Sequence, residues 1–132
     1  MPKIRYRRST QAIIFEHDDG TATHFECRAD IFPGVNGEGQ ERESLPNGNY
    51  IVSAEVPGGR DNGPAYGTFY IETHDGRERD IHGGGSDLED PFAPRQGWEP
   101  TYGCLRMQNE DGEELSRLII AAGNAVELEV TA

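Results

Sequence analysis

The sequence lacks a long apolar run and has little positive charge. It carries 12 lysine and arginine residues against 24 aspartate and glutamate residues, which gives a formal net charge of −12. Because nucleic-acid-binding proteins need a basic surface to neutralise phosphates, this balance excludes a general nucleic-acid binder. No stretch approaches the roughly 18 to 20 apolar residues of a membrane span, so no membrane span is expected.

A recognisable signal peptide is also missing. The chain starts with a basic cluster of Lys3, Arg5, Arg7 and Arg8, as the n-region of a signal peptide does. No apolar h-region follows, because the segment 9–20 contains only a four-residue apolar run. The sequence therefore predicts no signal peptide in this chain and leaves the compartment open.

Cysteine and aromatic residues are scarce, whereas glycine is abundant. The two cysteines, Cys27 and Cys104, permit either one disulfide or two free thiols, and their spacing does not decide between these. Aromatic residues make up 8% of the chain, while 17 glycines and 8 prolines indicate many turns and short strands instead of a helical bundle. At 132 residues the chain is expected to form a single domain over 1–132.

Alternating apolar residues predict strands along most of the chain. Apolar residues recur at every second position at Ile13 and Phe15 and again at Phe25 and Cys27, and the turn signal at 18–20 joins the two segments as a hairpin. The same pattern predicts further strands at 49–56, 66–73, 77–82 and 125–130.

One segment near the C-terminus predicts a helix. Asn109 is a good N-cap, and the acidic residues that follow suit the positive end of a helix dipole. Gly123 and Asn124 mark its end. The residues expected to face the core at helical spacing are Leu115, Leu118, Ile119 and Ala122. The sequence thus predicts a mainly β fold, a sandwich or barrel, with one principal helix.

Cys104 and His82 are the candidate catalytic pair. A cysteine nucleophile needs a base, an oxyanion site and access to solvent. His82 ends a predicted strand and enters three glycines, so its ring can project into a cleft and act as that base. The alternative is purely structural, with a buried thiol and a strand-end histidine bonded to the backbone.

The residues around Cys104 offer the other parts of such a site. The backbone amides of Tyr102, Gly103 and Cys104 can converge on an oxyanion. Arg106 can lower the pKa of the thiol or bind a substrate carboxylate, while a salt bridge to the acidic helix would explain it equally. The remaining histidines and Cys27 match no zinc spacing, so no metal is expected.

These motifs resemble the L,D-transpeptidase catalytic domain family (YkuD-type). In that family a histidine-glycine pair is followed by a variable loop, then Ser/Thr-x-Gly-Cys, an apolar residue, and Arg or Asn. The matching residues are His82, Gly83, Thr101, Gly103, Cys104, Leu105 and Arg106. The similarity is strongest over residues 45–130, and Tyr102 stands where many members carry a second histidine.

The resemblance implies an L,D-transpeptidase-like barrel or sandwich that transfers acyl groups on bacterial peptidoglycan stem peptides without a cofactor. Cys104 would be the nucleophile and His82 the base, oriented by the carbonyl of Gly83 or Gly84 or, as a weaker candidate, by Asp80. Thr101, Tyr102, Gly103 and Arg106 would serve the oxyanion or the substrate, and the long loop after His82 would form a lid.

Other roles remain open under the same resemblance. One is a hydrolytic L,D-carboxypeptidase, which includes a secreted antibacterial effector or a phage-encoded wall enzyme. Another is a non-catalytic peptidoglycan-binding module. The expected place of action is the bacterial periplasm or cell wall, reached by secretion or phage delivery. The sequence leaves the oligomeric state open and is compatible with a monomer.

Overall fold

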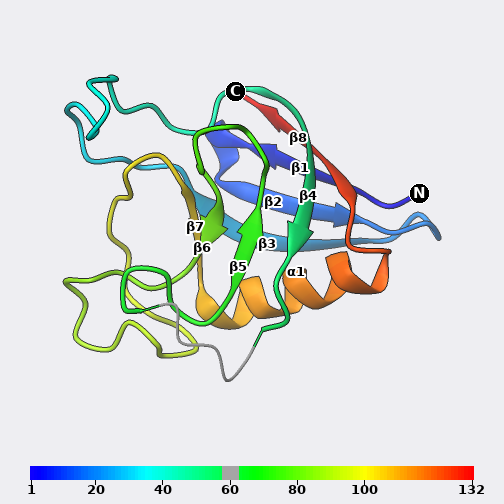
Figure 1. The fold of residues 1–132 in the computed structure, drawn as a ribbon. Coiled ribbons are helices and arrows are strands. Elements are labelled where there is room, and N and C mark those ends of the chain that lie inside the picture. The colour runs from blue at the N-terminus through cyan, green and yellow to red at the C-terminus, as the bar shows by residue number, and fades with distance from the viewer. Residues whose placement is uncertain (58–62) are drawn as a thin grey trace.

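The alternating apolar pattern builds a closed barrel (Figure 1). The computed structural model describes residues 1–57 and 63–132, and within them the strand order around the barrel is β1-β2-β3-β7-β6-β5-β4-β8. The described elements are β1 (Lys3–Arg7), η1 (Arg8–Thr10), β2 (Ala12–Glu16), β3 (Ala22–Arg28), β4 (Gly48–Ala54), β5 (Tyr70–Glu72), β6 (Ile81–His82), β7 (Leu105–Met107), α1 (Asn109–Ala121) and β8 (Val126–Thr131).

Most neighbouring strands are antiparallel, but the pairs β1–β8 and β6–β7 run parallel. β1 and β8 are the first and last strands of the chain, so their pairing closes the barrel. β6 and β7 are joined by the long segment 83–104, as parallel neighbours require a crossover connection. The fold is mainly β with one principal helix in the described residues, as the sequence predicts.

The core is built from the inward-facing residues of these strands. Ile13, Phe15, Phe25 and Cys27 are all buried, in agreement with their alternation in the sequence. Burial of this apolar surface is the main favourable contribution to folding. Cys27 and Cys104 are free thiols, which decides the question that their spacing leaves open.

Helix α1 packs its apolar face against β4, β5 and β6. Leu115 and Ile119 are buried, and Leu118 and Ala122 pack against the core at its margin. The predicted N-cap is wrong by one residue: Gln108 has the extended backbone of a cap, with φ −61° and ψ 144°. Asn109 is the first helical residue because its side chain binds two loops instead, as described below.

The strands before the cysteine are shorter than the sequence predicts. The segments 66–73 and 77–82 contain only β5 (Tyr70–Glu72) and β6 (Ile81–His82). The reason is visible at Asp75, whose carboxylate accepts hydrogen bonds from the backbone amides of Arg77 and Arg79. Those amides are therefore not available for a strand ladder, and the connection folds into a tight loop.

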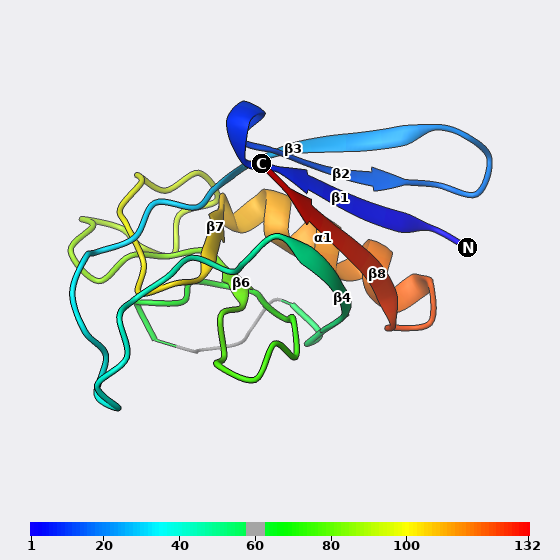
Figure 2. The ribbon, with the colours of Figure 1, turned by 90° about the horizontal axis from the view of Figure 1, so that it is seen from above.

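The long connections gather at one end of the barrel. The segments 30–47 and 83–104 lie on the side away from the N-terminus in both views (Figures 1 and 2). This end carries the residues that the sequence singles out. Among the described residues, no helix has the length and apolar character to cross a membrane.

Candidate active site

The parallel pair β6–β7 brings Cys104 and His82 to the same end of the barrel. Ile81 is opposite Leu105, and His82 is opposite Arg106. The Leu105 amide donates to the Asp80 carbonyl at 2.9 Å, which extends this register by one residue toward Cys104. Because side chains alternate along a strand, Cys104 and Arg106 share a face with His82. Two segments that are distant in sequence thereby form one site.

The thiol of Cys104 lies against the loop before β6. The Asp80 amide donates to Sγ at 3.3 Å, and the thiol is placed to donate to the Glu78 carbonyl at 3.6 Å. Burial raises the pKa of the Cys104 thiol to about 11, although the Asp80 amide and the Arg106 charge act in the opposite direction. The group is therefore a neutral thiol at pH 7 and needs a base to become a nucleophile.

His82 can supply that base. Its Nδ1 is 2.9 Å from the Gly83 carbonyl, and because a carbonyl oxygen only accepts, Nδ1 carries the proton. Nε2 then keeps a free lone pair. Burial lowers the pKa of His82 to about 4, with a smaller opposing effect of the Gly83 hydrogen bond and a further lowering by Arg106. The ring is thus neutral at pH 7 and can accept a proton.

Two tyrosines hold the His82 ring. Tyr70 stacks on it, with centroids 6.1 Å apart and planes 10° apart, and Tyr66 meets it edge-on at 4.9 Å. The Tyr70 hydroxyl in turn donates to the buried Asp80 carboxylate at 2.6 Å. Tyr70 therefore connects the Asp80 carboxylate to the histidine ring, and the ring itself is hydrogen-bonded to the Gly83 carbonyl.

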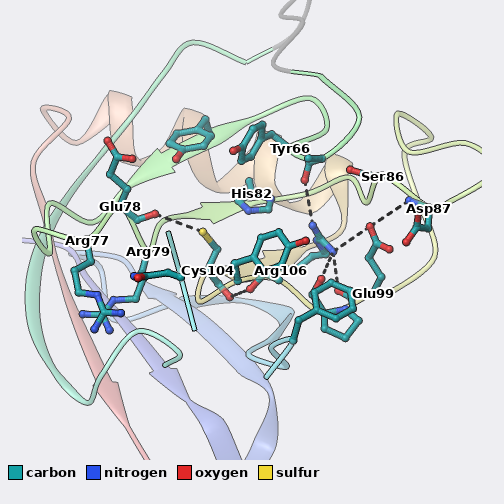
Figure 3. A pocket seen from close by; sticks show the side chains of 17 residues that line it. Tyr66, Arg77, Glu78, Arg79, His82, Ser86, Asp87, Glu99, Cys104 and Arg106 are labelled. Carbon is teal, nitrogen blue, oxygen red and sulfur yellow. Dashed lines mark hydrogen bonds and ion pairs between the residues drawn. The ribbon is translucent and has the colours of Figure 1, made fainter. Parts of the chain in front are cut away.

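Cys104 and His82 line one cavity of about 360 Å³ (Figure 3). Its other walls come from the segments 32–36, 65–79 and 86–106, which include Tyr70 of β5 and Arg106 of β7. In the described part of the chain no hydrogen bond joins the Cys104 sulfur to the His82 ring, since the thiol is directed to Glu78. Proton transfer between the two side chains therefore requires the thiol to rotate away from that carbonyl.

The turn before Cys104 fixes the nucleophile. The Thr101 hydroxyl donates to the Cys104 carbonyl at 2.7 Å and accepts from the Gly103 amide at 3.1 Å. The Gly103 amide is thus engaged inside the turn, which leaves the Tyr102 and Cys104 amides as candidate oxyanion donors. Gly103 has φ +142°, and a Cβ there would lie 2.8 Å from the Glu43 carbonyl, so only glycine fits.

Arg106 supports the cavity walls. It is 4% exposed, and its Nη atoms donate to the backbone carbonyls of Glu99, Pro100 and Ala65. Its ion partner is the Glu99 carboxylate at 3.9 Å, so the predicted alternative of a salt bridge to the acidic helix is wrong. A guanidinium bonded in this way ties the loop 99–100 to the loop at Ala65, and its charge still reaches both Cys104 and His82.

The glycines after His82 permit a close approach of three segments. A Cβ at Gly83 would lie 2.1 Å from Asn109 Oδ1, and one at Gly84 would lie 2.5 Å from the Gly67 amide nitrogen. Asn109 is fully buried: it accepts from the Thr68 amide and donates to the carbonyls of Pro91 and Ala93. One side chain thus fixes both the loop before β5 and the loop predicted to be a lid.

Sequence reasoning singled out Tyr102 and Arg106 but missed other aromatic and basic residues that line this cavity. Tyr66 and Tyr70 fall in a segment predicted as an ordinary strand, and Arg77 and Arg79 in the next. The spacing Asp75-x-Arg77-x-Arg79 is the one signal that could have indicated a loop closed by its own carboxylate. Within residues 1–57 and 63–132, no group of three or more His, Cys, Asp or Glu side chains is placed to hold a metal ion.

Comparison with known proteins gives a likeness at the level of the fold. No family model matches the chain, and no curated protein matches it. Among solved structures the chain is similar to the crystal structure of the L,D-transpeptidase (residues 123–326) from Xylanimonas cellulosilytica DSM 15894, with a TM-score of 0.53 at 13% identity. The alignment covers 98% of this chain and 59% of that chain. At this identity the likeness shows the fold alone, which is L,D-transpeptidase-like.

Proposed function

We propose that this protein is a cysteine acyltransferase that acts on peptidoglycan stem peptides, as an L,D-transpeptidase does. The observation that carries the proposal is the shared cavity, in which a thiol and a neutral histidine with a free Nε2 face the same space. The fold likeness to an L,D-transpeptidase supports the substrate class. The site of action that follows from this substrate is the bacterial cell wall.

The first half-reaction forms a thioester. His82 Nε2 takes the proton from Cys104 Sγ as the sulfur attacks the carbonyl carbon of the scissile amide. The resulting oxyanion is stabilised by the amides of Tyr102 and Cys104, and the protonated histidine then gives its proton to the leaving amine. The carbon–nitrogen bond breaks and the acyl group stays on sulfur.

The second half-reaction releases the acyl group. An acceptor amine attacks the thioester carbonyl and His82 takes its proton, which returns the thiol after the carbon–sulfur bond breaks. If water takes the place of the amine, the product is a shortened stem and the protein is an L,D-carboxypeptidase. The exposed rim of the cavity, which includes Tyr102 at 68% exposure, leaves room for either acceptor.

Analysis of muropeptides tests the proposal. Sacculi or isolated tetrapeptide stems treated with the wild-type protein should yield cross-linked dimers or shortened stems. Cys104→Ala should yield neither while it keeps the far-ultraviolet circular dichroism of the wild type. Cys27→Ala is the matched control, because Cys27 is fully buried on β3 and outside the cavity. Turnover by Cys104→Ala would overturn the proposal, and binding without turnover by the wild type would favour a peptidoglycan-binding module.

A further inference from the structure

Two arginines lie on the loop that the Cys104 sulfur contacts. Sγ of Cys104 lies 3.3 Å from the Asp80 amide and 3.6 Å from the Glu78 carbonyl, so it lies along the segment 78–80. Arg77 and Arg79 are the neighbours of Glu78 in the chain, and both line the cavity. Figure 3 shows both on the same side of Cys104, opposite Ser86, Asp87 and Glu99. The cavity therefore has a basic end beside the nucleophile.

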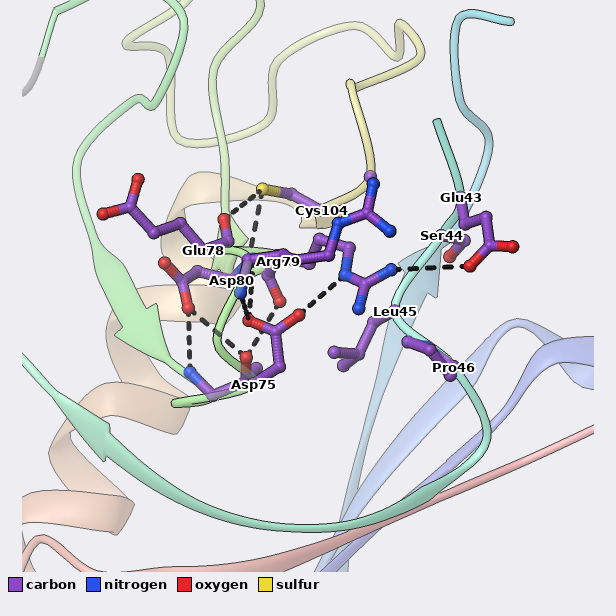
Figure 4. Close-up of polar contacts among 12 residues, drawn as sticks. Glu43, Ser44, Leu45, Pro46, Asp75, Glu78, Arg79, Asp80 and Cys104 are labelled. Atoms are coloured by element: carbon purple, nitrogen blue, oxygen red, sulfur yellow. Dashed lines mark hydrogen bonds and ion pairs between the residues drawn. The ribbon is translucent and has the colours of Figure 1, made fainter. Parts of the chain in front are cut away.

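Arg79 is held there with part of its guanidinium unused. Its Nε donates to Asp75 at 2.6 Å, an ion pair whose Asp75 side chain is 2% exposed (Figure 4). Its methylene groups run beside Gly103, since a Cβ on that glycine would lie 3.0 Å from Arg79 Cγ. The Arg79 residue is 9% exposed, and its buried Nη1 donates no hydrogen bond to the described part of the chain.

The ion pair of that Nη1 with Glu43 is weak. Glu43 lies 3.8 Å from it, beyond hydrogen-bonding distance, and the Glu43 side chain is 62% exposed. Exposed ion pairs of this kind contribute little because water screens them and the side chain loses freedom. A buried donor without a hydrogen bond is costly, so a carboxylate that reaches it gains a charge-assisted bond. Glu43 can be displaced by such a ligand.

Arg77 adds a second, more accessible cation. It is half-buried, and its Nη2 donates to the Glu41 carbonyl at 3.2 Å, which fixes the side chain. Its guanidinium makes no other hydrogen bond to the described residues, so further donors can bind a ligand. The exposed Glu78 carboxylate lies at the same end of the cavity and works against an anion, but it is solvated. At the opposite end of the cavity Asp87 and Glu99 repel a ligand carboxylate. An acidic group is therefore favoured at the arginine end.

We propose that Arg77 and Arg79 form a carboxylate-binding subsite beside Cys104, which holds a free carboxylate one residue from the scissile bond. The proposal deepens the proposed function and takes the peptide substrate from it. A C-terminal residue carries its carboxylate on the Cα next to the scissile nitrogen, so a cation close to the thiol reaches it. The subsite makes the protein select chain ends over internal peptide bonds.

Alkylation of Cys104 tests the subsite independently of peptide turnover. Iodoacetate and iodoacetamide react in the same way: the sulfur–carbon bond forms, the carbon–iodine bond breaks, iodide leaves with the bonding pair and the thiol proton goes to the buffer. Iodoacetate carries a carboxylate where iodoacetamide carries a neutral amide. Both rate constants are followed by mass spectrometry at low ionic strength. Because both reagents react with the same thiolate, the fraction of ionised thiol cancels in the ratio of the rate constants. The ratio therefore measures how strongly the site attracts the carboxylate of iodoacetate.

The expected result is a fall of this ratio by about three- to tenfold in Arg77→Gln, the range for one partly solvated charge-assisted hydrogen bond. Arg117→Gln on α1 is the matched control, because it removes one positive charge from an exposed position remote from the cavity and should leave the ratio unchanged. Glu43→Gln should raise the ratio, since it removes the competing acid. Added salt should weaken the effects of both Arg77→Gln and Glu43→Gln.

Equal ratios for the wild type, Arg77→Gln and Arg117→Gln would overturn the subsite. Arg79→Lys is a second probe that keeps the charge, and failure of that buried variant to fold leaves the Arg77 comparison decisive. Stem peptides that end in a free acid or in an amide give the functional readout: the wild type should prefer the acid and Arg77→Gln should lose the preference. If the wild type turns over neither peptide, the proposed function fails while the alkylation ratios still decide the subsite.

Discussion

The thiol of Cys104 points to the carbonyl oxygen of Glu78, a residue whose own backbone has φ +55°. A left-handed conformation is unusual for glutamate, and such strain persists only where the surrounding structure imposes it. Here the Asp75 carboxylate imposes it through the amides of Arg77 and Arg79. The loop thus holds the thiol directed at the Glu78 carbonyl instead of at His82.

The pH dependence of Cys104 reactivity follows from this arrangement. With the pKa of the thiol raised to about 11, the rate of alkylation by iodoacetamide should rise about tenfold per pH unit from pH 7 toward 10. His82→Gln should show the same slope, because the histidine is neutral throughout that range. Peptide mapping of the adduct over a pH series measures it. A plateau between pH 6 and 8 would mean that the thiolate is already formed and would contradict the prediction.

Stability should fall in mild acid because of His82. Its pKa is lowered to about 4 in the folded protein, against about 6.5 when unfolded, so between these values the unfolded state binds more protons. The contribution of neutral His82 to the free energy of unfolding is fully present above pH 6.5 and is lost as pH falls toward 4. The free energy of unfolding should fall by up to about 3 kcal/mol over this interval.

Urea unfolding at pH 7.5 and pH 5 measures this loss. His82→Gln, which does not titrate, should lose less stability than the wild type over the same interval. Equal losses in the two proteins would show that the acidic groups alone carry the pH dependence and that His82 does not contribute.

Asn109→Asp should release the loop over 86–98. The Asn109 amide group donates to the carbonyls of Pro91 and Ala93, and a carboxylate would place oxygen against both. The loss is expected to be about 2 to 4 kcal/mol, for two buried hydrogen bonds and a buried charge. Limited proteolysis and amide hydrogen exchange should show the loop opening first. Asn36→Asp, in a hydrogen-bonded turn outside the loop 86–98, is the control and should leave that loop protected.

Gly112→Ala should destabilise the protein although it lies inside a helix. Alanine normally favours a helix over glycine by about 1 kcal/mol. Here a Cβ would lie 2.0 Å from the Phe69 ring, so α1 must move away from the core. We expect a loss of about 1 to 3 kcal/mol, measured by chemical denaturation. Gly37→Ala, where nothing lies within 4 Å of the new Cβ, should change stability by less than about 1 kcal/mol. A stabilised Gly112→Ala would show that the helix adjusts at no cost.

Local patterns in the sequence predict most of the strands and the principal helix, because each depends on neighbours in the chain. The contact of His82 with the Gly83 carbonyl is expected from the family resemblance. The partners of Arg106 could not be predicted, since Ala65 and Glu99 are brought to it by two different loops. Asn109 shows the same limit. Its residue type suits a helix cap, but contacts with Pro91 and Ala93 gain more from its amide group than a cap would.

The closure of the barrel has a consequence for how the protein is made. β1 pairs in register with β8, so Lys3 is opposite Glu127 and Arg7 is opposite Thr131. Contacts between residues so distant in sequence close late, because the entropy of a large loop must be overcome before they form. During synthesis on the ribosome, one edge of β1 therefore stays unpaired until β8 has left the exit tunnel. Cys104 and His82, which meet on the opposite side of the barrel through β6 and β7, can come together before that closure.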